Sequence, residues 1–413
     1  MNKYLRIVVT GDVDSGKSTL IGRLLSELNP LSRHMVDEVS LACQRLGRDF
    51  EFAYLLDSLE EERHEERTID TTQVFCKARN GLEMVFIDVP GHQELLHNML
   101  SGSSQADAAV LVVDAGKPIA EQTRRQAFIL EFLGIKSVVV ALNKMDAVGF
   151  QEQAFERGKA GIEMFLKSIH LAPGSFVPIS AKQGENLIIP SKLMEWYNGL
   201  SLIEVLSSEA FSGKLFAAHS VFDNAGFVFL VQDIYHLNKK KVAVGPLAHG
   251  SVVLRSPCRV LPGNTKNRVE KIVALDRPVR NASAPFGAGL ILRDMACLKR
   301  GDVICGCDSL VVRREFPAKI FCLKQLRQDA RYDLKCGTQE TPARLSEITR
   351  AWETSDMREI TVTRRHLEEN TLAQIIVSTE NPLVTADSVS AGSLGRFVLR
   401  GQEGDIEAVG MIS

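Results

Sequence analysis

Residues 11–18 carry the clearest chemical signal in the sequence, because they read Gly-Asp-Val-Asp-Ser-Gly-Lys-Ser and match the phosphate-binding pattern G-x-x-x-x-G-K-[ST] at every fixed position. Such a loop turns successive backbone N–H groups toward one point, where they bind phosphate oxygens together with the positive end of the following helix. Lys17 adds a mobile positive charge, and Ser18 offers a hydroxyl to a metal ion. The residues expected to hold the phosphates are Gly11, Asp12, Val13, Asp14, Ser15, Gly16, Lys17, Ser18 and Thr19.

Three further motifs follow this loop in a fixed order. In Asp88-Val89-Pro90-Gly91-His92, the Asp88 carboxylate can hold Mg²⁺ through water while the Gly91 N–H faces a terminal phosphate. In Asn143-Lys144-Met145-Asp146, the Asp146 carboxylate can accept the N1–H and the exocyclic amine of guanine, and adenine offers no such pair of donors. Ser180-Ala181-Lys182 is expected to bracket the edge of the base. The set predicts a GTP-binding domain whose ligands are GTP and Mg²⁺.

The first 200 residues alternate apolar runs with amphipathic stretches, which predicts an α/β domain with a mostly parallel sheet and helices on both faces. Ligands of such sheets bind at the carboxyl ends of the strands, and Gly11, Asp88, Asn143 and Ser180 each lie at or just after such an end. The predicted strands are 4–9, 82–88, 108–114, 137–142 and 175–179, and the predicted helices are 19–25, 93–103, 120–133 and 152–170.

After about residue 210 the pattern changes to short apolar runs separated by Gly and Pro, which is typical of antiparallel β-barrels. We expect one barrel over residues 215–307 and a second over 316–411, with turns at Gly245-Pro246 and Pro262-Gly263. The expected domains are therefore 1–206 for GTP binding, 207–308 for the first barrel and 309–413 for the second.

Composition narrows the class of protein. The eight cysteines of the 413 residues lack the C-x-x-C pairs of zinc sites, and Cys305-Gly306-Cys307 is interpreted as strand packing. A net charge of −2 disfavours a wide nucleic-acid surface, because such surfaces usually carry a basic excess. No targeting or membrane-spanning run is visible, so we expect a soluble, cytoplasmic protein without a membrane partner.

These motifs resemble those of the translation-factor class of GTPases, whose phosphate loop reads G-x-V-D-x-G-K and whose next motif reads D-x-P-G-H. The resemblance implies that Thr68 closes over the γ-phosphate and binds Mg²⁺ with Ser18 and Asp88, and that His92 positions the attacking water. Lys17, Thr68 and His92 are thereby the expected catalytic residues. Glu66 and Arg67 stand where the family has glycine and isoleucine, so this segment departs from the pattern.

Within that class, several stretches are similar to the GTPase subunit of bacterial heterodimeric sulfate adenylyltransferase. They are Gln122-Thr123-Arg124-Arg125, Leu133-Gly134-Ile135-Lys136 and Val231-Gln232-Asp233-Ile234-Tyr235. This similarity implies a small adenylyl-transferring partner, and coupling of GTP hydrolysis to formation of adenylyl sulfate and pyrophosphate from ATP and sulfate. The partner, not this chain, would hold ATP and sulfate.

Two alternatives stay open at this point. One is a translation-type factor that delivers an RNA to the ribosome, although Lys239-Lys240-Lys241, the compact basic run of the barrels, is interpreted as a solvated hairpin tip. The other is a regulatory switch without coupled chemistry. Copurification discriminates between them: an adenylyl-transferring protein, RNA or ribosomes, or neither.

Overall fold

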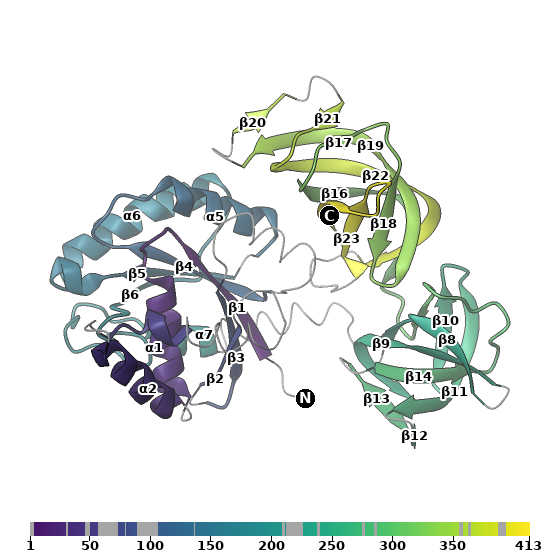
Figure 1. Ribbon diagram of the computed structural model, residues 1–413, viewed down its shortest axis with the longest axis horizontal. Helices are drawn as coiled ribbons and strands as arrows, with labels where there is room; N and C mark the ends of the chain where they lie inside the picture. Colours follow the sequence, from purple (N-terminus) through teal and green to yellow (C-terminus); the bar gives the residue numbers. More distant parts are fainter. Residues whose placement is uncertain are drawn as a thin grey trace. The chain divides into compact units, whose positions relative to one another are not determined.

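The computed structural model describes residues 4–29, 32–45, 50–56, 73–78, 80–88, 106–135, 137–208, 211, 226–237, 240–274, 277–284, 287–354, 358–361, 365–386 and 394–413. The chain divides at residue 216 into two units, an α/β unit and a unit built of β-strands. Figure 1 shows both.

A six-stranded sheet with the order β2-β3-β1-β4-β5-β6 forms the centre of the N-terminal unit (Figure 1). All neighbours in it run parallel except β2 and β3, which pair antiparallel. The predicted mostly parallel sheet is therefore confirmed. The strands are β1 (Tyr4–Gly11), β2 (Gln73–Lys77), β3 (Glu83–Asp88), β4 (Ala108–Asp114), β5 (Val138–Asn143) and β6 (Ser175–Pro178).

Helices connect these strands and cover the sheet. The predicted helices over 120–133 and 152–170 are confirmed within two residues at each end, whereas the one predicted over 93–103 lies outside the described residues. The sequence interpretation missed α2, α7 and the edge strand β2. The helices are α1 (Lys17–Leu28), α2 (Ser32–Arg45), α5 (Glu121–Phe132), α6 (Glu152–Ser168) and α7 (Leu202–Ser207), with a short 3₁₀ helix η1 (Met145–Val148).

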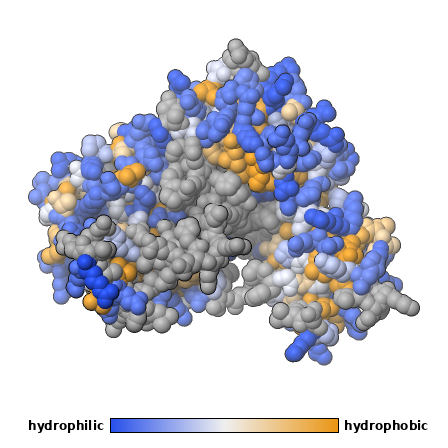
Figure 2. Space-filling model, viewed as in Figure 1, coloured by the Kyte–Doolittle hydropathy of each residue, from blue (hydrophilic) through white to orange (hydrophobic). Residues whose placement is uncertain are grey.

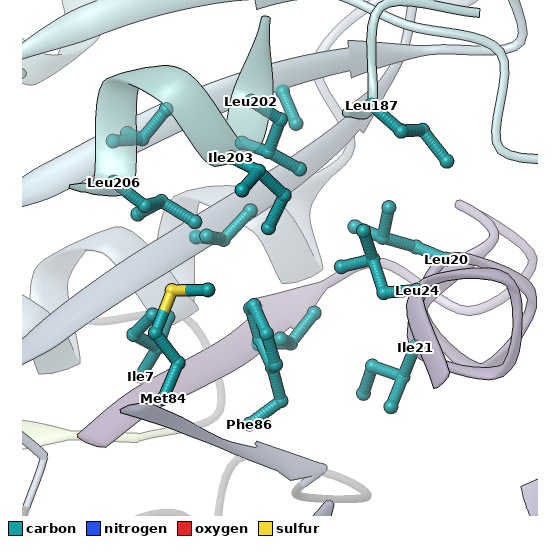
Figure 3. Close-up of a cluster of buried hydrophobic side chains, with 14 of the residues drawn as sticks. Ile7, Leu20, Ile21, Leu24, Met84, Phe86, Leu187, Leu202, Ile203 and Leu206 are labelled. Carbon is teal, nitrogen blue, oxygen red and sulfur yellow. The ribbon is translucent and has the colours of Figure 1, made fainter. Parts of the chain in front are cut away.

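The main core of this unit lies between the sheet and helices α1 and α7. Figure 3 shows Leu20 and Leu24 of α1 and Leu206 of α7 converging on Ile7 of β1 and Phe86 of β3. A second cluster joins Phe155 of α6 to Leu142 and Met145, on the other face of β5. Each buried branched or aromatic side chain of this kind contributes about 1.5–3 kcal/mol, so the strand ends are held on a rigid base.

The core of the first barrel contains alternate residues of the segment that begins at β7, namely Phe227, Phe229 and Val231. Gly245 and Pro246 lie inside strand β9, so the turn predicted there is wrong. Gly245 is needed for close strand approach, because a Cβ at this position would lie 1.8 Å from the Leu230 carbonyl oxygen. The strands are β7 (Phe227–Leu230), β8 (Asp233–Leu237), β9 (Lys240–Val253), β10 (Pro257–Leu261), β11 (Thr265–Ala274), β12 (Arg277–Val279), β13 (Asn281–Ser283), β14 (Gly287–Leu292) and β15 (Val303–Cys305).

The second barrel ends in the predicted hairpin of β23 and β24, which pair antiparallel. Phe316 and Phe397 pack edge to face in its core, with ring centroids 6.0 Å apart. The strands are β16 (Leu310–Cys322), β17 (Leu326–Arg327), β18 (Tyr332–Cys336), β19 (Gln339–Glu353), β20 (Glu359–Ile360), β21 (His366–Leu367), β22 (Thr371–Ala386), β23 (Arg396–Arg400) and β24 (Ile406–Ile412).

An apolar junction joins the two barrels of this unit. Val228 and Leu230 of β7 alternate with the core-facing Phe227 and Phe229, and they cluster with Val384 of β22.

On the face drawn in Figure 2, hydrophilic residues predominate on the described surface, and hydrophobic residues form separate groups. Among the described residues, no helix combines the length and apolar character that a membrane crossing requires.

Candidate nucleotide-binding site

The loop between β1 and α1 has the geometry of a phosphate cradle. Gly11 has a φ of +155°, and a Cβ there would lie 2.2 Å from the Val112 carbonyl oxygen. Gly16 has a φ of +91°, and a Cβ there would lie 2.4 Å from Nδ2 of Asn143. Both positions therefore require glycine, and the loop leads directly into the N-terminus of α1 at Lys17, where free backbone N–H groups favour anions.

The Lys17 side chain folds back into this loop. Its Nζ donates to the carbonyl oxygens of Gly11 at 2.9 Å and Asp12 at 2.7 Å. Burial lowers the pKa of Lys17, while the charges of Asp88, Asp12 and Asp14 act in the opposite direction. An ammonium that donates to two carbonyl oxygens at the N-terminus of a helix can exchange these acceptors for phosphate oxygens, so the loop fits a nucleoside phosphate.

Ser18 and Asp88 bring two oxygens together beside the loop. The Ser18 hydroxyl donates to Oδ2 of Asp88 at 3.3 Å, across the ends of α1 and β3. Mg²⁺ typically takes one or two protein oxygens together with phosphate oxygens and water, so this donor set fits that ion. The other predicted residues of this part of the site, Thr68, Gly91 and His92, lie outside the described residues, as do Glu66 and Arg67.

Asn143, at the end of β5, connects the phosphate loop to the predicted base-binding loop. Its Nδ2 donates to the Ser15 carbonyl oxygen at 2.7 Å, and its Oδ1 accepts the Ala181 N–H at 2.9 Å. The side chain is buried, so both of its polar groups are satisfied by protein. One residue thus fixes two loops that lie far apart in the sequence.

Asp146 and Ser180 form the next contact along the site. The Ser180 hydroxyl donates to Oδ1 of Asp146 at 2.6 Å and accepts the Gln183 N–H at 3.2 Å. Asp146 lies on η1, half-buried, directly after β5. A carboxylate held in this way keeps a fixed orientation and can accept two parallel N–H groups from a planar base.

Lys144 has a partner that the sequence interpretation missed. Lys144 has a φ of +63°, and its Nζ lies 3.0 Å from Oδ2 of Asp114, whose Oδ1 accepts the Gly116 N–H at 2.9 Å. Asp114 ends β4 and pairs in register with Asn143 at the end of β5. That register could have identified it, because polar residues that end neighbouring parallel strands meet at one edge of the sheet.

The remaining predicted residues lie along the same edge of the sheet. Val13 is 69% exposed, and its N–H donates to Oδ1 of Asp12 at 2.8 Å. Asp14 has a φ of +61°, Thr19 follows the phosphate loop directly, and Lys182 is the last residue of the Ser180-Ala181-Lys182 motif. The described site residues therefore gather along the carboxyl ends of β1, β3 and β5 and just beyond the end of β6.

Two parts of the chain match known protein families. Residues 2–218 match the family described as the elongation factor Tu GTP binding domain, and residues 315–413 match the GTP-eEF1A C-terminal domain-like family.

Relatives with two different names resemble the chain to a similar degree. Elongation factor 1-alpha of Thermoplasma volcanium is 32% identical, over 96% of this chain and 95% of the relative. Sulfate adenylyltransferase subunit 1 of Citrobacter koseri is 33% identical, over 92% of this chain and 80% of the relative. The subunit 1 of Bacteroides thetaiotaomicron is 30% identical, over 99% and 86%. With its α/β domain, its two barrels and this degree of identity, the chain belongs to the family of GTPases that share the elongation factor Tu GTP-binding domain.

Proposed function

We propose that this protein is the GTP-binding and GTP-hydrolysing subunit of a sulfate adenylyltransferase. In this role it couples GTP hydrolysis to the formation of adenylyl sulfate and pyrophosphate from ATP and sulfate by a small adenylyl-transferring partner. The observation that carries the proposal is similarity to relatives named sulfate adenylyltransferase subunit 1 over 92% and 99% of the chain. The word "subunit" in those names supports the expectation of a partner protein.

The geometry of the site supports the GTP-dependent half of this proposal. Lys17 and the backbone N–H groups of its loop would neutralise the phosphates, and Ser18 and Thr68, with Asp88 through water, would hold Mg²⁺. The ion would neutralise charge that develops on the phosphate oxygens. Asp146 would read guanine, and Lys144, Ala181 and Lys182 would frame the base. His92 would orient the water that attacks the γ-phosphate.

A coupled assay tests this proposal. The purified chain alone should form no adenylyl sulfate, and with the small subunit present GTP should stimulate pyrophosphate release from ATP and sulfate. His92→Ala should abolish most of this stimulation and leave GTP binding nearly intact, because the water is no longer oriented. His236→Ala replaces an exposed histidine of β8 and serves as the matched control. Activity of the isolated chain, or stimulation that survives His92→Ala, would contradict the proposal.

The second candidate is a translation-type factor that delivers an RNA to the ribosome. The relatives named elongation factor 1-alpha favour it, because one of them matches 96% of the chain at 32% identity. Copurification separates the two candidates. A small adenylyl-transferring protein in the eluate supports the first, and RNA or ribosomal particles support the second.

A further inference from the structure

Arg23, on the outer side of helix α1, contacts the loop that carries Ser180 and Ala181. Its Nη1 donates to the Lys182 carbonyl oxygen and its Nη2 to the Gln183 carbonyl oxygen, each at 3.4 Å. Its Nε forms an ion pair with Glu27 one turn along the helix. The Arg23 side chain is 23% exposed, and both carbonyl bonds are long and reach solvent, so the contact holds through its several partners together and not through one strong bond.

Gly184 makes room for this contact. It has a φ of +81°, and a Cβ there would lie 2.5 Å from Nη2 of Arg23 and 2.9 Å from Oε1 of Glu27. Its N–H donates to the Ser180 carbonyl oxygen at 2.8 Å, so residues 180–184 form one turn. The absence of a side chain at Gly184 lets that turn lie directly on the Arg23–Glu27 pair.

Phe52 fixes the guanidinium from another direction. The Cζ atom of Arg23 lies 4.6 Å from the centroid of the Phe52 ring, within range of a cation–π contact. The neighbouring Gly22 permits this approach, because a Cβ there would lie 2.0 Å from the Phe52 carbonyl oxygen. Three kinds of partner therefore hold one planar group, a carboxylate, an aromatic ring and a pair of carbonyl oxygens, which leaves the guanidinium little freedom to move.

We infer that Arg23 is a positioning residue for guanine recognition. The turn that it holds also supplies the Ser180 hydroxyl bonded to Asp146 and the Ala181 N–H bonded to Asn143. The position of the turn thus sets the orientation of the Asp146 carboxylate. Arg23 acts through this turn and touches no substrate atom. The inference rests on the guanine-nucleotide site of the proposed function, and it is independent of sulfate activation.

Arg23→Ala tests the inference when affinities for GDP and inosine diphosphate are measured by calorimetry on the full chain. Inosine diphosphate keeps the ribose and both phosphates but lacks the exocyclic amine, so the ratio of the two dissociation constants reports on the base edge alone. Arg23→Ala should weaken GDP binding roughly threefold to tenfold, because the turn loses two long, solvent-exposed hydrogen bonds from a charged group, and it should lower the preference for GDP over inosine diphosphate. Arg23→Lys should retain only part of the GDP affinity and only part of the preference for GDP over inosine diphosphate. A lysine ammonium cannot donate two N–H groups from one planar group as the guanidinium does.

Arg125→Ala is the matched control. Arg125 also pairs with a glutamate four residues away, Glu121 of helix α5, although in the reverse order along the helix, and its side chain is 22% exposed. Any change in GDP affinity that comes from loss of a helix ion pair alone should therefore be similar in both variants. The preference for GDP over inosine diphosphate should fall only in Arg23→Ala.

Gly184→Ala reaches the same contact from the opposite side without changing Arg23. The added methyl should push the ends of the Arg23 and Glu27 side chains off the turn and so lower the GDP preference in the same direction. Gly81→Ala is its control, because Gly81 has a φ of +88° and no atom lies within 4 Å of its ideal Cβ. That variant carries the backbone strain alone and should leave both dissociation constants unchanged.

Equal loss of GDP and inosine diphosphate affinity in Arg23→Ala, or no loss, would overturn the role of Arg23. A wild-type chain that prefers neither GDP to inosine diphosphate nor GDP to ADP would instead overturn the guanine site itself. The two failures are thus distinguishable.

Discussion

The side-chain amide of Asn143 donates to the Ser15 carbonyl oxygen at 2.7 Å, so a residue at the end of β5 sets the shape of the loop that follows β1. Asn143→Ala would leave this carbonyl and the Ala181 N–H without their buried partner. We expect the free energy of unfolding to fall by about 2–4 kcal/mol, since each buried group left unsatisfied costs about 1–3 kcal/mol. Urea denaturation measures it.

Asn80→Ala is the control for this prediction. The Asn80 side chain also donates to a backbone carbonyl, that of Ser207, and also accepts a backbone N–H, that of Leu82, but both bonds are solvent-exposed. Water replaces exposed partners, so this variant should lose less than about 1 kcal/mol. Equal losses of unfolding free energy in Asn143→Ala and Asn80→Ala would show that burial does not determine how much the Asn143 hydrogen bonds stabilise the fold.

Asp114 should influence nucleotide affinity through Lys144. In Asp114→Asn the residue can still accept the Gly116 N–H, but the charge that holds the Lys144 ammonium is gone. We expect GDP to bind roughly threefold to tenfold more weakly, a modest change because the Lys144 side chain is 32% exposed and solvent screens the pair. Lys117→Ala removes the more exposed ammonium beside Asp114, 3.7 Å away, and should leave GDP affinity unchanged. Equal effects of the two variants would refute a specific role for Lys144.

Asp146→Asn should exchange the base preference of the site. In the native chain the Ser180 hydroxyl lies 2.6 Å from Oδ1 of Asp146. The amide oxygen of an Asn side chain can still accept this hydrogen bond, so the loop should keep its position. Its amide would present a donor to the xanthine oxygen and would no longer accept both guanine donors. GTP affinity should fall roughly a hundredfold or more and xanthosine triphosphate affinity should rise, as a titration with both nucleotides measures. Asp233→Asn in β8 is the control, and a variant that keeps its GTP preference would show that Asp146 does not read the base.

The Cys307 thiol should react at a lower pH in the native chain than in Cys305→Ala. A hydrogen bond from the side chain of Cys305 lowers the pKa of Cys307, because it stabilises the thiolate, and the thiolate is the form that iodoacetamide alkylates. The rate of Cys307 alkylation, followed by mass spectrometry, should therefore rise at a higher pH in Cys305→Ala than in the native chain. Superimposable Cys307 profiles in the two chains would rule out the hydrogen bond.

Much of the fold followed from local patterns in the sequence. Strand β4 was predicted with its observed ends, because Ala108–Asp114 is apolar throughout and buried on both faces of the sheet. Strand β2 was missed, because Gln73–Lys77 is a short edge strand whose alternating pattern is weak. Gly245-Pro246 was misread as a turn, because the sequence does not show that another backbone passes 1.8 Å from the missing Cβ.

The candidate site also contains some residues that the sequence predicted and others that it did not. Fixed motifs identified Lys17, Asn143 and Asp146, since their spacing reflects one chemistry. Asp114 and Arg23 were missed, because their contacts depend on strand register and on the packing of α1 against a distant loop. The roles of Lys17, Asn143 and Asp146 in nucleotide binding stay predictions, as do those of Thr68 and His92.

The apolar junction between the barrels limits how the C-terminal half can be cut. A fragment that ended at residue 308 would lose Leu310 and Val384 and would bring Val228 and Leu230 to its surface, as a contiguous apolar face of the kind that promotes aggregation. A fragment that began at residue 309 would carry the complementary face. The smallest piece of this half that stays soluble in a deletion series should therefore contain both barrels.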